Sequence, residues 1–493
     1  MRRILNNRPI VFCAFSLATG MIVTALYGGV SVLPYVISAL CALFCLLCFL
    51  FKPLKKFKIE AIVISLFFIS GALYTVYNIF LYNDDALRAG ESLIINGTVS
   101  DVATASSGNF RITLSDLKTG NEGAYGNACF YADNATFNCG DIIRLKGDIK
   151  FLPFSIANYS SKTSLKITNV TVLSATAPVN PFYVASGFVK NLILTNVGGD
   201  EGGIMVALLL GDTSKIDESA LSNFRLSGIS HIFAVSGLHV VFFSSVIGAV
   251  LSLFKINGVK NTIIGAVFCL LYAGLCGFPV SCVRAVIMSI TLNLVKNIGR
   301  KYDVLNSLFL SFIIVLAIFP NTLFSYGFIL SYLAVFSIAL CNKSFESYFT
   351  FLPESIASSL SVSFAVSFIM TPALFTMFGY SSLIVVFLNV LLVPMVSVLY
   401  TLSFAATILT AIFPFMGFSF KIPYFVAYFL NSFLVEINSR VFTVSGGISV
   451  VAIILYYLFA FVFCERTNFK KPVKLIFGLM SMATLVMSFF GVL

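Results

Sequence analysis

The residues of this chain that are best suited to chemistry stand inside an apolar run. The segment GISHIFAVSGLHV, residues 228–240, contains His231 and His239, the only histidines among 493 residues, together with Ser236 and Gly237. Ionisable side chains inside hydrocarbon are costly unless they face a cavity or a partner. The cluster therefore indicates a functional site, with a histidine packed against a backbone carbonyl between helices as the structural alternative.

Helical spacing limits what these residues can do. In a continuous helix, His231 and His239 lie about 12 Å apart along the axis and about 80° apart around it, so they cannot share a metal ion. We therefore expect no metal and no cofactor. Ser236 and His239 lie side by side, which allows a hydrogen bond, and Gly237 suits either close helix approach or a broken helix that lines a cavity.

A second polar group interrupts the apolar sequence at LCGFPVSCVRA, residues 275–285. Gly277 and Ser281 precede Arg284, which stands about one turn into the next apolar run. A guanidinium there can bind a phosphate or carboxylate through two hydrogen bonds. The alternative is an arginine that extends to the membrane surface. Asn389, in FLNVLLVP, is a weaker candidate that supplies an amide to the interior of a span.

Composition defines the class of protein. Hydrophobic residues make up 59% of the chain, charged residues 10%, and the mean hydropathy is +0.99, which indicates a polytopic α-helical membrane protein. We count three apolar runs before residue 83 and seven to nine after residue 228, or about ten to twelve spans. Arg2, Arg3, Arg8 and the KPLKKFK stretch place the N-terminus inside, because basic loops stay in the cytoplasm.

Between these regions the sequence changes to short alternating segments separated by Gly, Asn and Asp, the pattern of a small β-barrel. Five such strands suit an OB-like barrel, while a sandwich or another small barrel fits the same pattern. The orientation places this domain outside the membrane. Cys129 and Cys139 are its only cysteines. An oxidising exterior permits a disulfide between them, which we hypothesise; two separate thiols are the alternative.

The predicted organisation has four parts. Residues 1–82 form an N-terminal membrane segment of three helices, and residues 83–180 form the external OB-like domain. Residues 181–227 are expected to be interfacial amphipathic helices, and residues 228–493 a many-span membrane domain. The net charge of +11 is explained by basic cytoplasmic loops and requires no anionic partner.

Several motifs in the same order resemble the ComEC-type competence channel family. They are LLLGD at 208–212, FRLSGISHIFAVSGLHV at 224–240, Tyr272 followed by GFPVSCVRAVIM, Pro320 before YGFILSY, and FLNVLLVP. The resemblance covers nearly the whole chain. It implies a channel for single-stranded transforming DNA in the bacterial cytoplasmic membrane, with a competence domain as the many-span region and no enzymatic activity.

The resemblance also implies partners: single-stranded DNA, the lipid bilayer, an external DNA receptor, a cytoplasmic ATP-driven motor and a homo-oligomeric assembly. Longer family members end in a metallo-β-lactamase-like domain. This chain has no histidine after His239, so we expect the nuclease to be a separate polypeptide. The residues expected along the DNA path are His231, Ser236, Gly237, His239, Tyr272, Gly277, Ser281, Arg284 and Asn389.

Two other functions fit parts of the same pattern. An intramembrane serine hydrolase would use Ser236 and a nearby histidine, but a nucleophile and its base usually come from separate elements. A secondary transporter of a small anion would use Arg284 and broken helices, although the sequence has no convincing internal repeat.

Overall fold

A computed structural model describes residues 8–26, 58–85, 89–104, 110–119, 122–133, 137–256, 258–381, 385–438, 444–445, 449–464 and 471–489. The second of the three spans expected before residue 83 lies outside these residues. The chain divides into two compact units. The barrel unit comprises Leu5–Ala185 and Phe309–Phe328, and the helical unit comprises Ser186–Leu308 and Ile329–Leu493.

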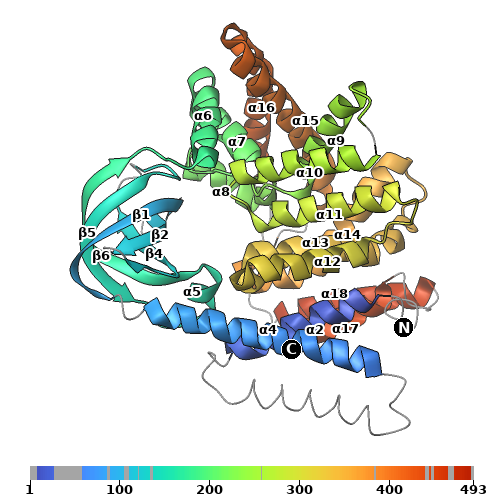
Figure 1. Cartoon of the computed structure of the whole chain (residues 1–493). Helices are drawn as coiled ribbons and strands as arrows, with labels where there is room; N and C mark the ends of the chain where they lie inside the picture. Colours follow the sequence, from blue (N-terminus) through green and yellow to red (C-terminus); the bar gives the residue numbers. More distant parts are fainter. Residues whose placement is uncertain are drawn as a thin grey trace. The chain divides into compact units, whose positions relative to one another are not determined.

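The barrel unit is built around strands that pair in a ring (Figure 1). β1 pairs with β2 and β5, β5 with β6, β6 with β4, and β4 with β2, while the two-residue β3 extends β2. Only the β4–β6 pair is parallel among the described pairings. The strands are β1 (Gly90–Thr104), β2 (Phe110–Thr119), β3 (Glu122–Gly123), β4 (Asn127–Ala132), β5 (Ile142–Phe151) and β6 (Thr163–Thr176).

Alternating residues of these strands fill the barrel interior. Ile112 and Leu114 of β2, Phe130 of β4 and Leu145 of β5 are buried in one core. Successive side chains of a strand point to opposite faces, so the intervening polar residues face outward. The change from helical to alternating patterning thus marks a real change of structure. The short helix α5 (Ile156–Ser160) lies between β5 and β6.

Helix α4 (Lys58–Asp84) is joined to the barrel by a buried carboxylate. Asp85, which follows the helix, accepts hydrogen bonds from the backbone N–H groups of Tyr125 at 2.9 Å and Gly126 at 2.8 Å. It also accepts one from the hydroxyl of Ser164 at 2.5 Å. A carboxylate can be buried only when its oxygens find such donors. Asp85 therefore fixes the end of α4 against two places on the barrel.

Two glycines bring α4 against α2 (Pro9–Leu26). A Cβ atom at Gly20 would stand 2.3 Å from the carbonyl oxygen of Phe68, and one at Gly71 would stand 2.4 Å from that of Leu17. No side chain fits at such distances, so the absence of a Cβ permits the backbones to meet. Small residues play this role where membrane helices pack closely.

The structure has no disulfide between Cys129 and Cys139, and their pairing in an oxidising exterior stays a prediction. Cys129 is buried on β4, where its strand partners are Thr113 of β2 and Lys166 of β6. Cys139 belongs to the turn before β5.

The helical unit contains most of the remaining elements (Figure 1). In chain order the helices are α6 (Pro181–Asn196), α7 (Gly199–Leu210), α8 (Glu218–Leu226), η3 (Ser230–Ile232), α9 (Gly237–Leu253), α10 (Gly258–Leu275), α11 (Val280–Asn297), α12 (Val304–Ile318), η4 (Pro320–Phe324), α13 (Tyr326–Glu346), α14 (Glu354–Phe378), α15 (Val385–Ile412), η5 (Pro414–Phe420), α16 (Lys421–Asn438), α17 (Val450–Phe463) and α18 (Lys471–Phe489). A two-residue pair, β7 (Tyr380–Ser381) with β8 (Val444–Ser445), completes it. The first turns of α6 and α13, most of α12 and all of η4 belong to the barrel unit.

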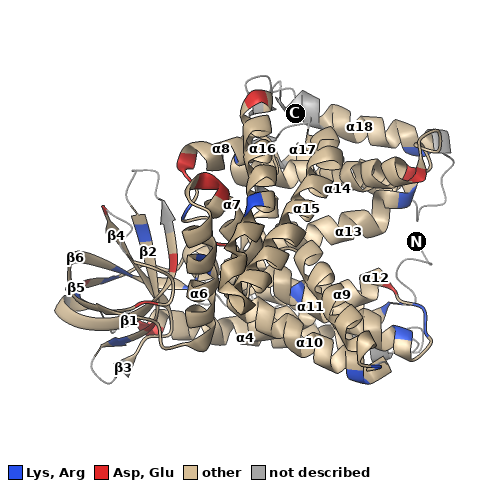
Figure 2. Ribbon diagram, turned by 90° about the horizontal axis from the view of Figure 1, so that it is seen from above, with Lys and Arg blue, Asp and Glu red and all other residues tan. Residues whose placement is uncertain are grey.

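The described residues include eight helices long and apolar enough to cross a membrane. They are Pro9–Leu26, Ile62–Asp84, Gly258–Leu275, Val280–Asn297, Tyr326–Glu346, Glu354–Phe378, Val385–Ile412 and Pro414–Ile437. Four shorter apolar helices, among them α9 and α12, have 10–17 residues. Figure 2 shows charged residues at the ends of α13 and α14 and none along α15. The protein is thus a mostly helical, polytopic membrane protein with a small β region.

Two expectations from the sequence need correction. Residues 228–254 do not form one continuous helix: His231 lies on η3, and α9 begins at Gly237. The run 202–210 of α7 is entirely buried, so this helix has no exposed face to lie along a membrane surface. α7 is apolar on all sides, and a helix of this kind is buried in the protein. Its residues accordingly pack against α15 and α16.

The glycine contacts predict opposite effects of the same substitution. Gly20→Ala should destabilise the protein by about 1–3 kcal/mol, since the added methyl overpacks the α2–α4 contact. Gly187→Ala is the matched control on α6, because a Cβ there meets nothing within 4 Å; it should stabilise by about 0.5–1 kcal/mol. Thermal unfolding of the purified protein in detergent measures both, and equal effects would contradict the packing argument.

Candidate functional site

The segment before α9 is a sharp turn. Gly228 has a φ of +70°, and a Cβ there would stand 2.2 Å from the side chain of Val385, so glycine is required for two reasons. His231 follows on η3 with an exposed side chain. Its Nδ1 lies 3.1 Å from the carbonyl oxygen of Gly228. The break separates the two histidines, and their spacing in a continuous helix does not apply.

His239 caps the start of α9. Its Nδ1 accepts the backbone N–H of Ser236 at 2.9 Å, and the Ser236 hydroxyl lies 3.2 Å from the same nitrogen. A side chain three residues after the N-cap that reaches back in this way completes half of a capping box. Because Nδ1 accepts, the neutral ring carries its proton on Nε2. That nitrogen is buried with no hydrogen-bond partner among the described residues.

Arg284 lies on α11 with only 6% of its surface exposed. Its Nε donates to the hydroxyl of Ser331 on α13 at 2.9 Å, and its Nη1 lies 3.5 Å from the sulfur of Met288. The guanidinium stands 5.7 Å from the ring centre of Tyr332. These partners are all neutral, and no carboxylate of the described residues pairs with Arg284.

The two polar segments identified in the sequence, around Gly237 and around Arg284, lie next to each other in the structure. A Cβ at Gly237, the first residue of α9, would stand 3.8 Å from Nη2 of Arg284 and 3.7 Å from the Cβ of Ala285. Ser281 ties the same regions together, because its hydroxyl donates to the carbonyl of Val235 at 2.6 Å. The start of α9 therefore lies against the first turns of α11, and His239 and Arg284 belong to one region.

Tyr272 links this region to α7. Its hydroxyl donates to the carbonyl oxygen of Leu209 at 3.0 Å and receives a hydrogen bond from Tyr400 at 3.2 Å. Its ring is stacked on Phe243, with 4.9 Å between centroids. The ring of His239 also contacts Tyr400, at 4.5 Å. Tyr272 is thus a buried structural link, and its ring is covered rather than open to a nucleic-acid base.

The remaining sequence candidates have different surroundings. Gly277 has a φ of +77° in the turn between α10 and α11, a conformation that favours glycine. Asn389 on α15 donates to the hydroxyl of Ser363 on α14 at 3.4 Å. Its hydrogen bond therefore links it to α14 and not to Arg284 or His239.

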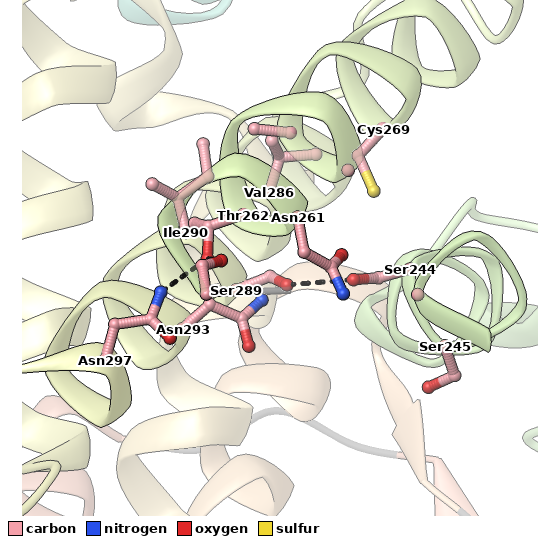
Figure 3. A pocket seen from close by; sticks show the side chains of 14 residues that line it. Ser244, Ser245, Asn261, Thr262, Cys269, Val286, Ser289, Ile290, Asn293 and Asn297 are labelled. Atoms are coloured by element: carbon pink, nitrogen blue, oxygen red, sulfur yellow. Dashed lines mark hydrogen bonds between the residues drawn. The ribbon is translucent and has the colours of Figure 1, made fainter. Parts of the chain in front are cut away.

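Sequence reasoning missed a polar cavity between α9, α10 and α11 (Figure 3). The cavity has a volume of about 230 Å³. Hydroxyl and amide side chains line it: Ser244, Asn261, Thr262, Ser289, Asn293 and Asn297. Two hydrogen bonds join its walls, Asn297 to Thr262 at 2.9 Å and Ser244 to Ser289 at 3.4 Å. The four-residue spacing of Ser289, Asn293 and Asn297 was the signal available in the sequence.

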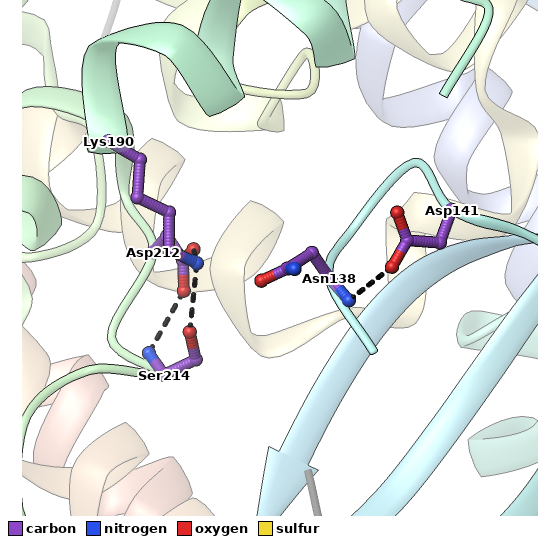
Figure 4. A network of polar contacts seen from close by, with 5 residues as sticks. All are labelled: Asn138, Asp141, Lys190, Asp212 and Ser214. Carbon is purple, nitrogen blue, oxygen red and sulfur yellow. Dashed lines mark hydrogen bonds and ion pairs between the residues drawn. The ribbon is translucent and has the colours of Figure 1, made fainter. Parts of the chain in front are cut away.

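A half-buried ion pair holds the segment after α7 (Figure 4). Lys190 on α6 donates to Asp212, the last residue of the LLLGD motif, at 2.5 Å, and the backbone N–H of Ser214 donates to the same carboxylate at 2.9 Å. Burial raises the pKa of Asp212, but the Lys190 charge and these hydrogen bonds outweigh it and leave the pKa below its ordinary value. The charged carboxylate is therefore part of the folded structure.

Helices of membrane-spanning length enclosing a buried arginine, a capped histidine and a polar cavity define a polytopic membrane protein with an internal polar site. A family model described as competence protein matches residues 208–469. The chain belongs to this family.

A curated relative is ComE operon protein 3 of Bacillus subtilis (strain 168), which is 29% identical over 227 residues. The match covers 45% of this chain and 29% of the relative's length. No solved structure matches the chain. The matched family region contains Asp212, His239 and Arg284, so the family and the site coincide along the sequence.

The ion pair at Asp212 predicts a pH-dependent stability. Asp212→Asn should destabilise the protein by about 1–3 kcal/mol at pH 7, because Lys190 keeps a half-buried charge without a counter-charge. Since the pKa is lowered on folding, this stabilisation is present above the ordinary pKa of 3.8 and is lost as the pH falls through the lowered value. The measurement is thermal unfolding in detergent across that pH range.

Glu218→Gln is the matched control. Glu218 pairs with Arg225, but both side chains are about half exposed, so the pair should contribute at most a few tenths of a kcal/mol. Equal losses from the two substitutions would show that burial of the Asp212 pair does not matter.

Proposed function

We propose that this protein forms a channel that carries single-stranded DNA across the bacterial cytoplasmic membrane during natural competence. Membership of the competence protein family and the name of the Bacillus subtilis relative support a role in competence. The observation that carries the channel proposal is Arg284, a buried cation with neutral partners on helices long enough to span a membrane.

The argument from Arg284 is electrostatic. Removing a guanidinium from water costs several kcal/mol unless an opposite charge or strong hydrogen bonds compensate. One neutral hydroxyl and one thioether are weak compensation. A phosphate of a passing strand would supply both the charge and two acceptor oxygens. Arg284 would thus bind each phosphate transiently as the polyanion moves, with Ser236, Gly237 and His239 beside it.

The cellular arrangement follows from the same proposal. The N-terminus lies inside and the barrel outside, according to the distribution of basic loops. An external receptor would deliver DNA, an ATP-driven motor would pull it from the cytoplasm, and a separate nuclease would remove the other strand. The channel would carry no enzymatic activity and no cofactor, and it would act as a single chain or a homo-oligomer.

We also infer that the barrel is OB-like and contacts the incoming strand. Its ring of five strands suits that fold, which binds oligonucleotides on its outer strands. On one outer surface, Arg111 of β2 is paired with the exposed Tyr131 of β4, and Lys150 of β5 is paired with Lys166 of β6. Lys166 stands 5.3 Å from the ring centre of Tyr131. Cations beside an exposed ring are the common means of contacting single strands.

The site geometry does not favour a serine hydrolase. The Ser236 hydroxyl and the Ser236 backbone N–H both approach Nδ1 of His239, which has a single lone pair. A base that already accepts a backbone hydrogen bond must first break that bond before it can take the proton of the nucleophile. A small-anion transporter would use the same arginine, and the uptake experiment below separates it from a DNA channel.

Replacing Arg284 tests the channel. Arg284→Ala should reduce uptake of labelled DNA into the cytoplasm at least about tenfold, because a charge-assisted hydrogen bond is worth about 1.5–3 kcal/mol. Arg284→Lys should retain part of the activity. Arg225→Ala removes the same charge from an exposed ion pair and should leave uptake unchanged.

All strains are compared at equal membrane levels with a strain lacking the gene. Normal uptake by Arg284→Ala would remove this residue from the path. Normal uptake by the deletion strain, if it carries no second channel gene, would overturn the channel itself and leave the small-anion transporter to be tested by flux into proteoliposomes.

The barrel surface is tested by binding. Tyr131→Ala should weaken binding of a fluorescent single-stranded oligonucleotide to the purified full-length protein by about 1–3 kcal/mol, the usual worth of base stacking on an aromatic ring. Leu173→Ala, an equally exposed apolar residue on β6, is the control and should have no effect. Unchanged binding by Tyr131→Ala would exclude this surface.

A further inference from the structure

The polar cavity between α9, α10 and α11 belongs to a longer polar track. On α11, Ser281, Ala285, Ser289, Asn293 and Asn297 recur every four residues, so each lies one turn from the next and the row winds around the helix by about 40° per step. The track runs about 24 Å along the helix axis, most of the thickness of a bilayer core. Arg284 stands beside its first turn, and the cavity occupies its second half.

Small residues of this region leave open space instead of closing it. A Cβ at Gly248 of α9 or at Gly265 of α10 would meet nothing within 4 Å. Gly20 and Gly71, in contrast, have backbone oxygens within 2.4 Å of such a Cβ. Close packing explains the second pair of glycines but not the first. Gly248 and Gly265 line the cavity and preserve its volume.

The cavity walls offer hydrogen bonds without fixed charge. Its hydroxyl and amide groups both donate and accept, and its volume has room for several water molecules, each of which needs two to four polar partners. Apolar lining would leave such a space dry. The described lining residues include no carboxylate and no cationic side chain.

Cations gather where the cavity reaches the helix ends. α9 ends and α10 begins at the connection around residues 254–258, and α11, which is antiparallel to α10, ends on the same side at Asn297. The exposed basic residues in these connections are Lys255, Lys260, Lys296, Arg300 and Lys301. Basic loops remain on the cytoplasmic side of a membrane, so this end of the cavity faces the cytoplasm.

We propose that the cavity lined by Ser244, Asn261, Ser289 and Asn293 is the cytoplasmic half of the DNA path, a water-filled passage between Arg284 and the basic helix ends. This inference rests on the proposed channel function. Amides and hydroxyls replace water around the sugar-phosphate chain without holding it. Fixed cations then act only at the two ends, which permits release, since conduction requires weak binding along the path.

The first test measures water access without any DNA. Asn293→Cys and its neighbour Leu294→Cys are treated with a membrane-impermeant anionic methanethiosulfonate in sealed inverted vesicles, and labelling is quantified on the α11 peptide by mass spectrometry. Asn293 lines the cavity, whereas the side chain of Leu294 lies on the outer surface of the helix. Only a hydrated thiol forms the reactive thiolate, so Asn293→Cys should label at least about tenfold faster. Equal, slow labelling would overturn the proposal.

The second test fills the cavity. Gly265→Leu and, from the opposite wall, Gly248→Leu should reduce DNA uptake at least about tenfold at unchanged membrane level. Val267→Leu adds bulk to the exposed outer face of α10 and should leave uptake unchanged. If the glycine variants accumulate normally and take up DNA normally, the cavity lies off the path and the inference fails.

These outcomes are separate from failure of the channel function. Normal uptake by a strain without the gene would overturn the channel proposal, whatever the labelling result. Loss of uptake in that strain, together with normal uptake in both glycine variants, would keep the channel and reject this route. If neither glycine variant reaches the membrane, the labelling comparison alone decides.

Discussion

The guanidinium of Arg284 is enclosed by helices, and no carboxylate of the described residues balances its charge. A buried guanidinium has only donors, so the hydrogen-bond acceptors nearby must be arranged around it. The start of α9, the first turns of α11 and Ser331 of α13 meet at this point. The break before α9 is part of that arrangement, because a helix continuing through Gly228 would carry Ser236 and Gly237 to other positions. The site is thus formed by the ends of helices as well as by residues within them.

The barrel unit also contains a buried charged group that needs hydrogen-bond partners. Asp85 is a fully buried carboxylate, and three donors from the β3–β4 turn and β6 satisfy it. These bonds join α4 to the barrel, so this group has a structural role. Arg284 and Nε2 of His239 are the opposite case, since each retains hydrogen-bonding capacity inside the protein. The comparison shows that burial alone does not select a candidate functional residue, whereas unsatisfied hydrogen-bonding capacity gives a further reason to propose one.

Small residues have opposite roles in two regions of the chain. Gly20 and Gly71 allow backbones of α2 and α4 to touch. Around the cavity, glycines and serines leave α9, α10 and α11 with space between them. A rigid contact suits a segment that anchors the barrel unit. An open polar space would suit the proposed passage of a solvated polymer, and the helices around it are tied at their other end by the Tyr272 and Ser281 hydrogen bonds.

The sequence by itself determined the broad architecture and the candidate residues. Hydropathy marks membrane helices because a span must be apolar for about 20 residues, and alternation marks the barrel strands because their side chains face opposite sides. His239 and Arg284 were identifiable because an ionisable residue in an apolar run is costly. The tertiary structure alone decided the break between His231 and α9 and the burial of α7. It also decided the cavity, because Ser244, Asn261 and Asn293 are unremarkable on their own helices and become a polar lining only when three helices turn them toward one another. The periodicity of a sequence shows which residues share a face of one helix. Which faces of different helices meet depends on the packing between those helices.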